Sequence, residues 1–298
     1  MKDVVVLPGS SCLELGNFIA TRLDSISIPI DLRIFSDGES KIRIDGNLLN
    51  KKCIVVQSTY PPVDSNIMQT LMIISCCYAY GASDVITVMP YMGYARQDRK
   101  FLDGEFPTIS LIARLLKCAN IHNLITVDIH SYKALSYFNL NIFNISSINS
   151  LANYAKTNFN LINPVVVSPD IGGVSRAKEF AKIINSNFFG LRKIRDRVSG
   201  NIVMDTNLEV DIKDCDIVII DDMISSGGTI LKAVDLLKKN QCGKIYVMCV
   251  HALADENSLN TLKKAGIADI VSTNSVPRSC SKVDLSMDIT NALYSIIC

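Results

Sequence analysis

Short apolar runs, most of them rich in Val and Ile, alternate along the chain with longer amphipathic stretches. The runs lie at 4–8, 53–58, 84–91, 123–130, 164–170, 216–223 and 244–251. Runs that are apolar on both faces are typical of parallel strands, and the stretches between them are typical of crossover helices. The pattern therefore predicts an α/β fold. At the first of these helices, Ser11 and Glu14 have the spacing of a capping box.

Two long segments contain the same order of elements. Residues 51–91 and 214–251 each run from a strand through a loop and a helix to a second strand. Any two strand–helix–strand units share this order, so the pattern favours an internal duplication without requiring it. A boundary in the Asn- and Ser-rich segment 139–150 predicts two domains, at 1–143 and 144–298. We expect the chemistry where the two copies differ.

The composition is that of an ordinary globular protein. Of the 298 residues, 48% are hydrophobic and 20% are charged, which excludes disorder as the main state. The chain has 30 Lys and Arg against 29 Asp and Glu, a net charge of +1. A charge so close to zero argues against nucleic acid or an anionic membrane as a partner.

No segment predicts secretion or a membrane span. The first residues lack the features of a signal peptide, and the most apolar stretch, 71–82, is shorter than the roughly 20 residues that a spanning helix needs. The ten cysteines are scattered and form no Cys-x-x-Cys motif. We therefore expect reduced thiols and a cytoplasmic protein.

The segment with the clearest chemistry is 218–230, where an apolar strand ends in Asp221 and Asp222 before a helix begins. Small residues lie between them: Ser225, Ser226, Gly227, Gly228 and Thr229. Amides at a helix start bind phosphate, and glycine lets the backbone approach a ligand. Paired carboxylates suit ribose hydroxyls or a metal. Acids after a buried strand are costly unless they are used, so an ordinary turn explains the segment less well.

This segment resembles the ribose-phosphate loop of type I phosphoribosyltransferases and of phosphoribosyl pyrophosphate synthases, the ribose-phosphate pyrophosphokinases. The resemblance implies that Asp221 and Asp222 hold the ribose hydroxyls and that 225–229 holds the 5-phosphate. It also implies two tandem type I phosphoribosyltransferase-like domains, each a mostly parallel sheet flanked by helices.

Two further segments resemble the synthases and not the plain phosphoribosyltransferases. The Asp-Gly turn at 35–39 is by itself a common hairpin signal. It is similar to the adenine-binding hairpin of the synthases, which implies contacts to ATP from Phe35, Asp37 and Glu39. The segment 91–105 also matches the synthase pattern, and the match implies that Arg96 and Gln97 contact ATP.

Two strand ends suggest magnesium. Alternate strand residues point to one face, so Asp128 and His130 are expected side by side, an arrangement that suits a hydrated Mg²⁺ and its nucleotide. The resemblance places the metal–ATP contact at His130. It also makes Asp170 a contact to the ribose phosphate and its metal, so Mg²⁺ is the expected cofactor.

The segment 191–200 is rich in cations, which is the usual composition of an exposed loop. In the synthases a Lys-x-Arg loop folds over the phosphates. Lys193 and Arg195 fit that spacing, and the resemblance implies a catalytic role for both. Arg192 and Arg197 leave the register slightly open.

The resemblance implies a complete reaction: the pyrophosphoryl group of Mg-ATP passes to the anomeric hydroxyl of ribose 5-phosphate, giving phosphoribosyl pyrophosphate and AMP. A homo-oligomer, dimer or hexamer, is implied as well. The alternatives are a phosphoribosyltransferase and a non-catalytic, synthase-associated regulatory subunit. Ser225 departs from the Asp that many members carry, and the short chain is most similar to archaeal members.

Overall fold

The computed structural model of the protein describes residues 3–195, 202–204 and 210–297, with the backbone alone for 193–195 and 202–204. Its contacts divide the chain into two compact units. Unit 1 comprises residues 1–146, 275–277 and 284–298, and unit 2 comprises residues 147–274 and 278–283.

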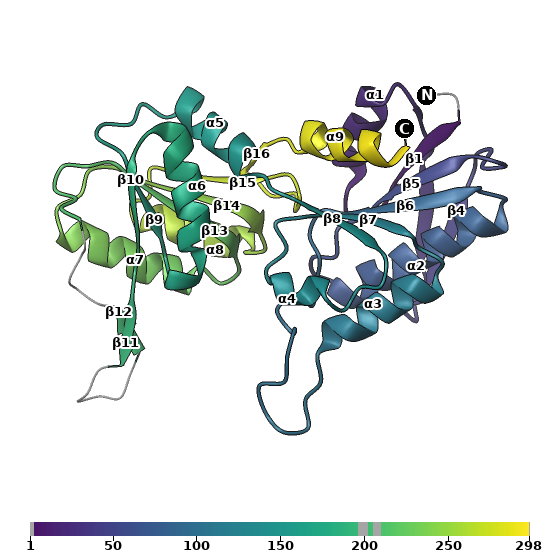
Figure 1. The fold of residues 1–298 in the computed structure, drawn as a ribbon, viewed down its shortest axis with the longest axis horizontal. Helices are drawn as coiled ribbons and strands as arrows, with labels where there is room; N and C mark the ends of the chain where they lie inside the picture. The colour runs from purple at the N-terminus through teal and green to yellow at the C-terminus, as the bar shows by residue number, and fades with distance from the viewer. Residues whose placement is uncertain (1–2, 196–201, 205–209, 298) are drawn as a thin grey trace. The chain divides into compact units, whose positions relative to one another are not determined.

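Unit 1 is built on a six-stranded parallel sheet (Figure 1). Its strands, in spatial order, are β2 (Ile26–Ser27), β1 (Val4–Pro8), β5 (Lys52–Val56), β6 (Asp84–Met89), β7 (Asn123–Val127) and β8 (Asn141–Ile145). The four central strands are almost wholly buried, which explains their continuous apolar runs. An antiparallel hairpin of β3 (Ile30–Ile34) and β4 (Ser40–Ile44) is inserted after β2.

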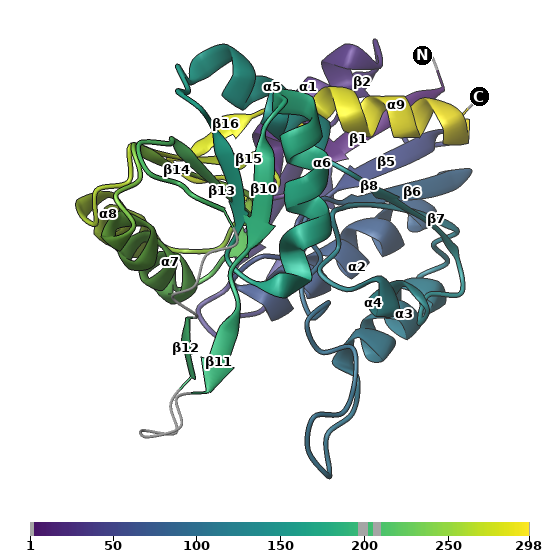
Figure 2. The same ribbon diagram turned by 60° about the vertical axis from the view of Figure 1, so that its left-hand side comes forward.

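Helices cover both faces of this sheet (Figure 2). One face carries α2 (Val63–Ala79), α3 (Thr108–Cys118) and the short α4 (Tyr132–Leu135), and the other carries α1 (Leu13–Arg22) and α9 (Ser286–Ile297). The main core of the unit lies between the sheet and the faces of α2 and α3 that carry Ile73, Ile74, Ile109 and Ile112.

Unit 2 contains a second six-stranded parallel sheet. Its strands, in spatial order, are β10 (Asn187–Gly190), β9 (Val165–Ser168), β13 (Ile217–Ile224), β14 (Ile245–Ala252), β15 (Asp269–Thr273) and β16 (Ser281–Val283). One face carries α5 (Ile148–Asn158) and α6 (Val174–Ile184), and the other carries α7 (Gly228–Lys239) and α8 (Glu256–Lys264). An antiparallel pair, β11 (Lys193–Arg195) and β12 (Ile202–Met204), follows β10.

The two sheets have the same topology. Each places its second strand outermost, followed by the first, third, fourth, fifth and sixth, and each inserts an antiparallel pair between the second and third strands. Strands β5 and β13, the third strands, are the pair that the sequence echo equates. The predicted α/β class, with two parallel sheets flanked by helices, is confirmed.

The last helix belongs to unit 1. Arg22 in α1 donates from Nε to Ser286 Oγ at 2.5 Å and pairs through Nη2 with Asp284 Oδ2 at 3.4 Å. Tyr294 Oη donates to the carbonyl of Arg22 at 3.2 Å. A single division at 143/144 places this helix with the second half of the chain, whereas its contacts place it with the first. The first segment of unit 1 ends at residue 146, three residues after the predicted boundary at 143.

Two further observations concern the expectations from composition. In the part of the chain that the structure describes, no helix is long and apolar enough to cross a bilayer. The described cysteines are free, and several lie in the cores as small apolar residues, among them Cys53, Cys77 and Cys249.

The packing of α9 gives a stability prediction. Leu293 in α9 is fully buried, so Leu293→Ala should destabilise the protein by about 2–5 kcal/mol through lost burial and a residual cavity. The chain has no Trp, so urea unfolding followed by circular dichroism measures this. The matched control is Leu49→Ala in the same unit, because Leu49 is 62% exposed. Equal midpoints for the two variants would contradict the placement of α9 in the core.

Candidate active site

In unit 2 the order of strands reverses between β9 and β13. The two strands run parallel and in register from Val165 opposite Ile217 to Val167 opposite Ile219, so the segments that follow them emerge at one edge of the sheet. In open α/β sheets, ligands bind at the carboxyl ends of the strands where the order reverses. Asp170 follows β9, and Asp221 and Asp222 lie near the end of β13. The structure thus brings these three predicted carboxylates to one ligand-binding position.

Asp221 is held in an electrostatically costly place. Its side chain is only 18% exposed, and Asp222 beside it is buried. Loss of hydration and the neighbouring Asp222 charge raise the pKa of Asp221 to about 8. Arg176 of α6 opposes this shift, with Nη1 3.7 Å from Asp221 Oδ1. A ligand hydroxyl could donate a hydrogen bond to an ionised carboxylate of this pair or accept one from a protonated carboxyl group.

The turn between β13 and α7 ends at the N-terminus of a helix, a position that favours anions. Gly227 has a positive φ of 76°, a conformation that glycine adopts without strain, and α7 begins at the next residue. Ser225, Ser226 and Gly228 are exposed and Thr229 is half-buried. The first amides of α7 therefore lie beside accessible hydroxyl groups, as phosphate binding requires.

Asp170 caps the short turn that leads into α6. Its Oδ1 accepts a hydrogen bond from the backbone N–H of Gly173 at 3.2 Å, and its carbonyl accepts one from Ser168 Oγ at 2.7 Å. These bonds fix a half-buried carboxylate at the end of β9. A carboxylate oxygen is a ligand of the kind that Mg²⁺ takes.

The corresponding position of unit 1, between β1 and β5, is filled by the protein itself. Gln57, Ser58 and Thr59 have no exposed surface. Gln57 Oε1 accepts from the N–H of Ser11 at 3.2 Å, and Ser11 Oγ donates to the carbonyl of Ser58 at 2.7 Å. The capping box expected at Ser11 is therefore wrong. The Ser11 hydroxyl donates to the carbonyl of Ser58, two residues after β5, and α1 has no side-chain cap.

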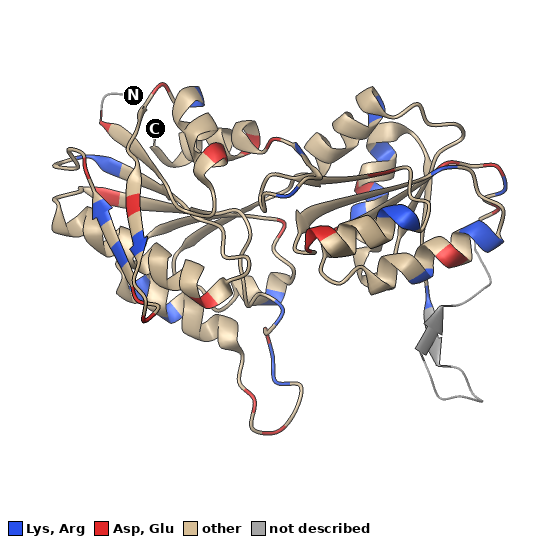
Figure 3. Ribbon diagram, turned by 180° about the vertical axis from the view of Figure 1, so that it is seen from behind, with Lys and Arg blue, Asp and Glu red and all other residues tan. Residues whose placement is uncertain are grey.

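The β3–β4 hairpin of unit 1 carries Phe35, Asp37 and Glu39 in its turn. The N–H of Phe35 donates to the carbonyl of Glu39 at 2.8 Å, and the N–H of Glu39 donates to Asp37 Oδ1 at 3.1 Å. The guanidinium of Arg33 lies 4.9 Å from the centre of the Phe35 ring. Phe35 is 36% exposed, so the hairpin presents an aromatic residue on which a base could stack. Figure 3 shows charges of both signs along this hairpin.

Arg96 and Gln97 follow β6 and are both exposed. Gln97 Oε1 accepts from Thr108 Oγ1 at 2.6 Å, which ties the segment to the start of α3. Asp98, the next residue, is buried and ion-paired with Arg99. Sequence reasoning missed Asp98 and, in unit 2, Arg176, because burial and pairing across elements leave no local signal.

Asp128 and His130 both lie beyond the end of the strand on which their expected alternation depends. Strand β7 ends at Val127, and Asp128 has a positive φ of 38°, so the rule for strand residues does not apply there. Asp128 is half-buried and His130 is exposed. After this residue, the N–H of Ile129 donates to Asn144 Oδ1 at 2.9 Å.

No group of three or more His, Cys, Asp or Glu side chains gathers as a metal site within the described residues. Magnesium usually keeps several waters and takes one or two carboxylates together with substrate phosphates. The separate carboxylates of Asp128 and Asp170 are donors of that type. Lys193 and Arg195 lie in β11, but their side chains fall outside the described residues.

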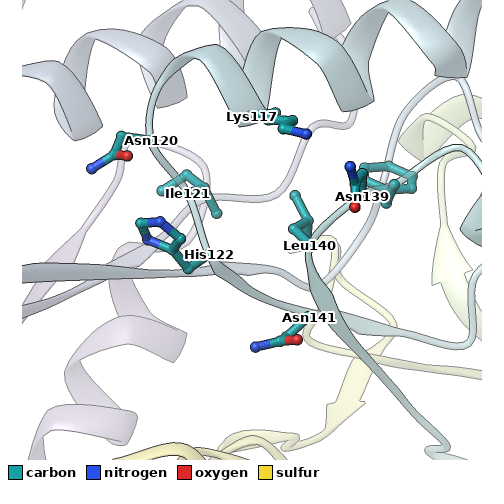
Figure 4. A pocket seen from close by; sticks show the side chains of 8 residues that line it. Lys117, Asn120, Ile121, His122, Asn139, Leu140 and Asn141 are labelled. Carbon is teal, nitrogen blue, oxygen red and sulfur yellow. The ribbon is translucent and has the colours of Figure 1, made fainter.

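Two cavities of unit 1 lie apart from most predicted contacts. One, of about 470 Å³, opens at the amino ends of β7 and β8, the edge of the unit 1 sheet opposite to the carboxyl ends of its strands (Figure 4). Its lining includes Lys117, His122, Asn139 and Asn141. The other, of about 280 Å³, is formed by 97–108 and contains Gln97.

Comparisons with known proteins agree with this geometry. A family model described as the N-terminal domain of ribose phosphate pyrophosphokinase matches residues 4–119, and a phosphoribosyl transferase domain model matches residues 140–285. The ribose-phosphate pyrophosphokinase of Methanopyrus kandleri is 34% identical over 98% of this chain and 99% of its own. That of Methanobrevibacter smithii is 34% identical over 97% and 99%.

The chain belongs to the ribose-phosphate pyrophosphokinase family. This confirms the resemblance seen in the sequence, including its similarity to archaeal members. The crystal structure of phosphoribosylpyrophosphate synthetase from Mycobacterium smegmatis has the same fold, with a TM-score of 0.88 over 99% of both chains at 24% identity.

The raised pKa of Asp221 predicts a pH-dependent stability. Because the folded protein disfavours the carboxylate, stability is lost as the pH rises from the unfolded-state pKa near 4 through about 8. Asp221→Asn should therefore raise the melting temperature relative to wild type at pH 8 and have little effect at pH 4.5.

Scanning fluorimetry at both pH values tests this. Asp235→Asn serves as the control, because Asp235 is a 68%-exposed acid of α7 in the same unit. A gain for Asp221→Asn that is the same at both pH values would contradict a raised pKa.

Proposed function

We propose that the protein transfers the pyrophosphoryl group of Mg-ATP to the anomeric hydroxyl of ribose 5-phosphate. The products are phosphoribosyl pyrophosphate and AMP. The observation that carries the proposal is the joint placement of Asp170, Asp221–Asp222 and the 225–229 turn at the strand-order reversal of unit 2, in a chain that matches ribose-phosphate pyrophosphokinases over nearly its whole length.

Unit 2 binds the sugar phosphate in this proposal. Asp221 and Asp222 accept hydrogen bonds from the ribose hydroxyls. The residues Ser225, Ser226, Gly227, Gly228 and Thr229, with the first amides of α7, hold the 5-phosphate. Arg176 offsets part of the charge of the acid pair, since it lies 3.7 Å from Asp221.

Unit 1 binds ATP. Phe35 stacks on adenine while Asp37 and Glu39 contact its polar edge, and Arg96 and Gln97 contact the phosphates. Arg96 is exposed and has no ion-pair partner within the described residues, so its charge is available to a ligand. His130, Asp128 and Asp170 contact the metal-bound substrates. When bound, Mg²⁺ neutralises phosphate charge.

In the reaction, the anomeric oxygen attacks the β-phosphorus of ATP. The bond from this phosphorus to the α,β-bridging oxygen breaks, AMP leaves, and the hydroxyl proton is released. Transfers of this kind depend chiefly on positioning and charge stabilisation. Lys193 and Arg195 stabilise the charge that develops on the moving group. The proposal includes a cytoplasmic homo-oligomer without nucleic-acid or membrane partners.

Release of AMP tests the proposal. Purified protein with Mg-ATP should form AMP only when ribose 5-phosphate is present, with an equal amount of phosphoribosyl pyrophosphate by chromatography. A protein that instead joins phosphoribosyl pyrophosphate to a nucleobase is a phosphoribosyltransferase. A protein that does neither, but changes the rate of an active synthase, is a regulatory subunit.

The proposed role of Lys193 gives a second test. Lys193→Ala should lower kcat by about 10²–10³-fold and change the KM values much less, because the contact strengthens in the transition state. Lys182→Ala, an exposed cation of α6, is the matched control and should keep wild-type kinetics. Unchanged turnover in Lys193→Ala would remove this residue from the mechanism.

A further inference from the structure

Asp98 is the buried residue of an exposed segment. Its exposed fraction is 2%, whereas Arg96, Gln97, Arg99 and Lys100 around it are exposed. An ionised side chain is rarely buried unless its hydrogen bonds are satisfied. The contacts of Asp98 therefore indicate what its burial maintains.

Both carboxylate oxygens of Asp98 are used. Oδ1 accepts from Arg99 Nε at 2.7 Å, and Oδ2 accepts from Arg99 Nη2 at 2.8 Å. This is the bidentate geometry in which an arginine holds a carboxylate most firmly. The pair keeps the pKa of Asp98 well below its usual range, chiefly through the Arg99 hydrogen bonds. The cation of Arg99 is thus occupied, in contrast to that of Arg96.

Two further bonds reach a distant part of the chain. Ser131 Oγ donates to Asp98 Oδ2 at 2.5 Å, and Tyr137 Oη donates to the Asp98 carbonyl at 3.0 Å. Ser131 is the N-cap residue of α4, yet its hydroxyl makes no capping bond. The contact with Asp98 takes the place of the cap. Ser131 directly follows His130.

The same segment is anchored at α3. The N–H of Ile109 donates to the Gln97 carbonyl at 3.4 Å, and Thr108 Oγ1 donates to Gln97 Oε1 at 2.6 Å. These bonds connect Gln97 to α3 and do not connect it to the segment of His130. Within the described residues, the side-chain hydrogen bonds that join 96–98 to 131–137 are those of Asp98 with Ser131 and Tyr137.

We infer that Asp98 is a positioning residue that holds the segment of Arg96 and Gln97 against the segment of His130. The inference rests on the proposed function, in which these three residues contact Mg-ATP. Asp98 itself touches no substrate. By fixing both segments before the nucleotide arrives, it removes an ordering cost from ATP binding.

Steady-state kinetics of Asp98→Asn tests the inference. The amide replaces one acceptor oxygen by an N–H₂ group, so at least one of the three donors that face the carboxylate loses its acceptor, and two lose it if Oδ2 is the atom replaced. The KM for Mg-ATP should rise about tenfold or more, and the KM for ribose 5-phosphate should stay within about twofold. A merely structural role would lower the active fraction, and thus kcat, with both KM values unchanged. That outcome would overturn the inference.

Ser131→Ala keeps the test decisive if Asp98→Asn fails to fold. It removes one bond and leaves the Asp98–Arg99 pair intact, so a smaller rise in the KM for Mg-ATP, about threefold, is expected. In the double variant the effects should not add, because the Ser131 bond needs Asp98. Additive effects would show that the two residues act separately. Asp103→Asn, the same change at an exposed acid of the same loop, should match wild type.

Hydrogen exchange separates this inference from the proposed function. In Asp98→Asn, the amides of 131–137 should exchange faster than in wild type, and those of α7 should not change. If wild type makes no AMP but this exchange pattern appears, the proposed function fails while the connection between the segments stands. If wild type is active and neither exchange nor the KM for Mg-ATP changes, the inference about Asp98 fails alone.

Discussion

Two adjacent carboxylates at the end of an otherwise apolar strand are the constraint on which the site in unit 2 depends. Burial of Asp221 beside Asp222 raises its pKa to about 8, and carboxyl groups perturbed in this way are concentrated at functional sites. Arg176 of α6 opposes part of that shift. The strand-order reversal between β9 and β13 places this pair at the edge of the sheet where ligands bind in open α/β folds.

The duplicated fold shows how one architecture serves two purposes. Both units have the same order of strands and the same place for an antiparallel insertion. In unit 2 the position between the first and third strands presents acids and the turn that leads into α7. In unit 1 the equivalent position is closed by Gln57, Ser58 and their bonds to Ser11. Unit 1 is thus left to offer ligands its hairpin and its loops, which agrees with the division of roles proposed for ATP and the sugar phosphate.

The hydrogen bonds of Asp98 illustrate how two such loops are held in one arrangement. Most residues of 96–100 and 130–133 are exposed, and ordering such segments on binding would reduce the affinity for a ligand. A single buried carboxylate, with both oxygens satisfied, connects them through Ser131 and Tyr137. The guanidinium of Arg99 is paired with this carboxylate, although the sequence alone makes Arg99 as plausible a phosphate ligand as Arg96.

The sequence by itself determined the α/β class, the central strands of both sheets, the echo between the two halves and the Asp221–Thr229 turn, because each depends on residues that are neighbours along the chain. The tertiary structure alone decided that α9 joins unit 1, that the crevice of unit 1 is closed, that Asp128 leaves the strand and that Asp98 is buried. These features arise from contacts between residues far apart in sequence, such as Arg22 with Asp284 and Asp98 with Ser131. No local pattern of hydrophobic and polar positions encodes the partner of a side chain, and for that reason the roles of the acids and arginines could be told apart only once the chain was folded.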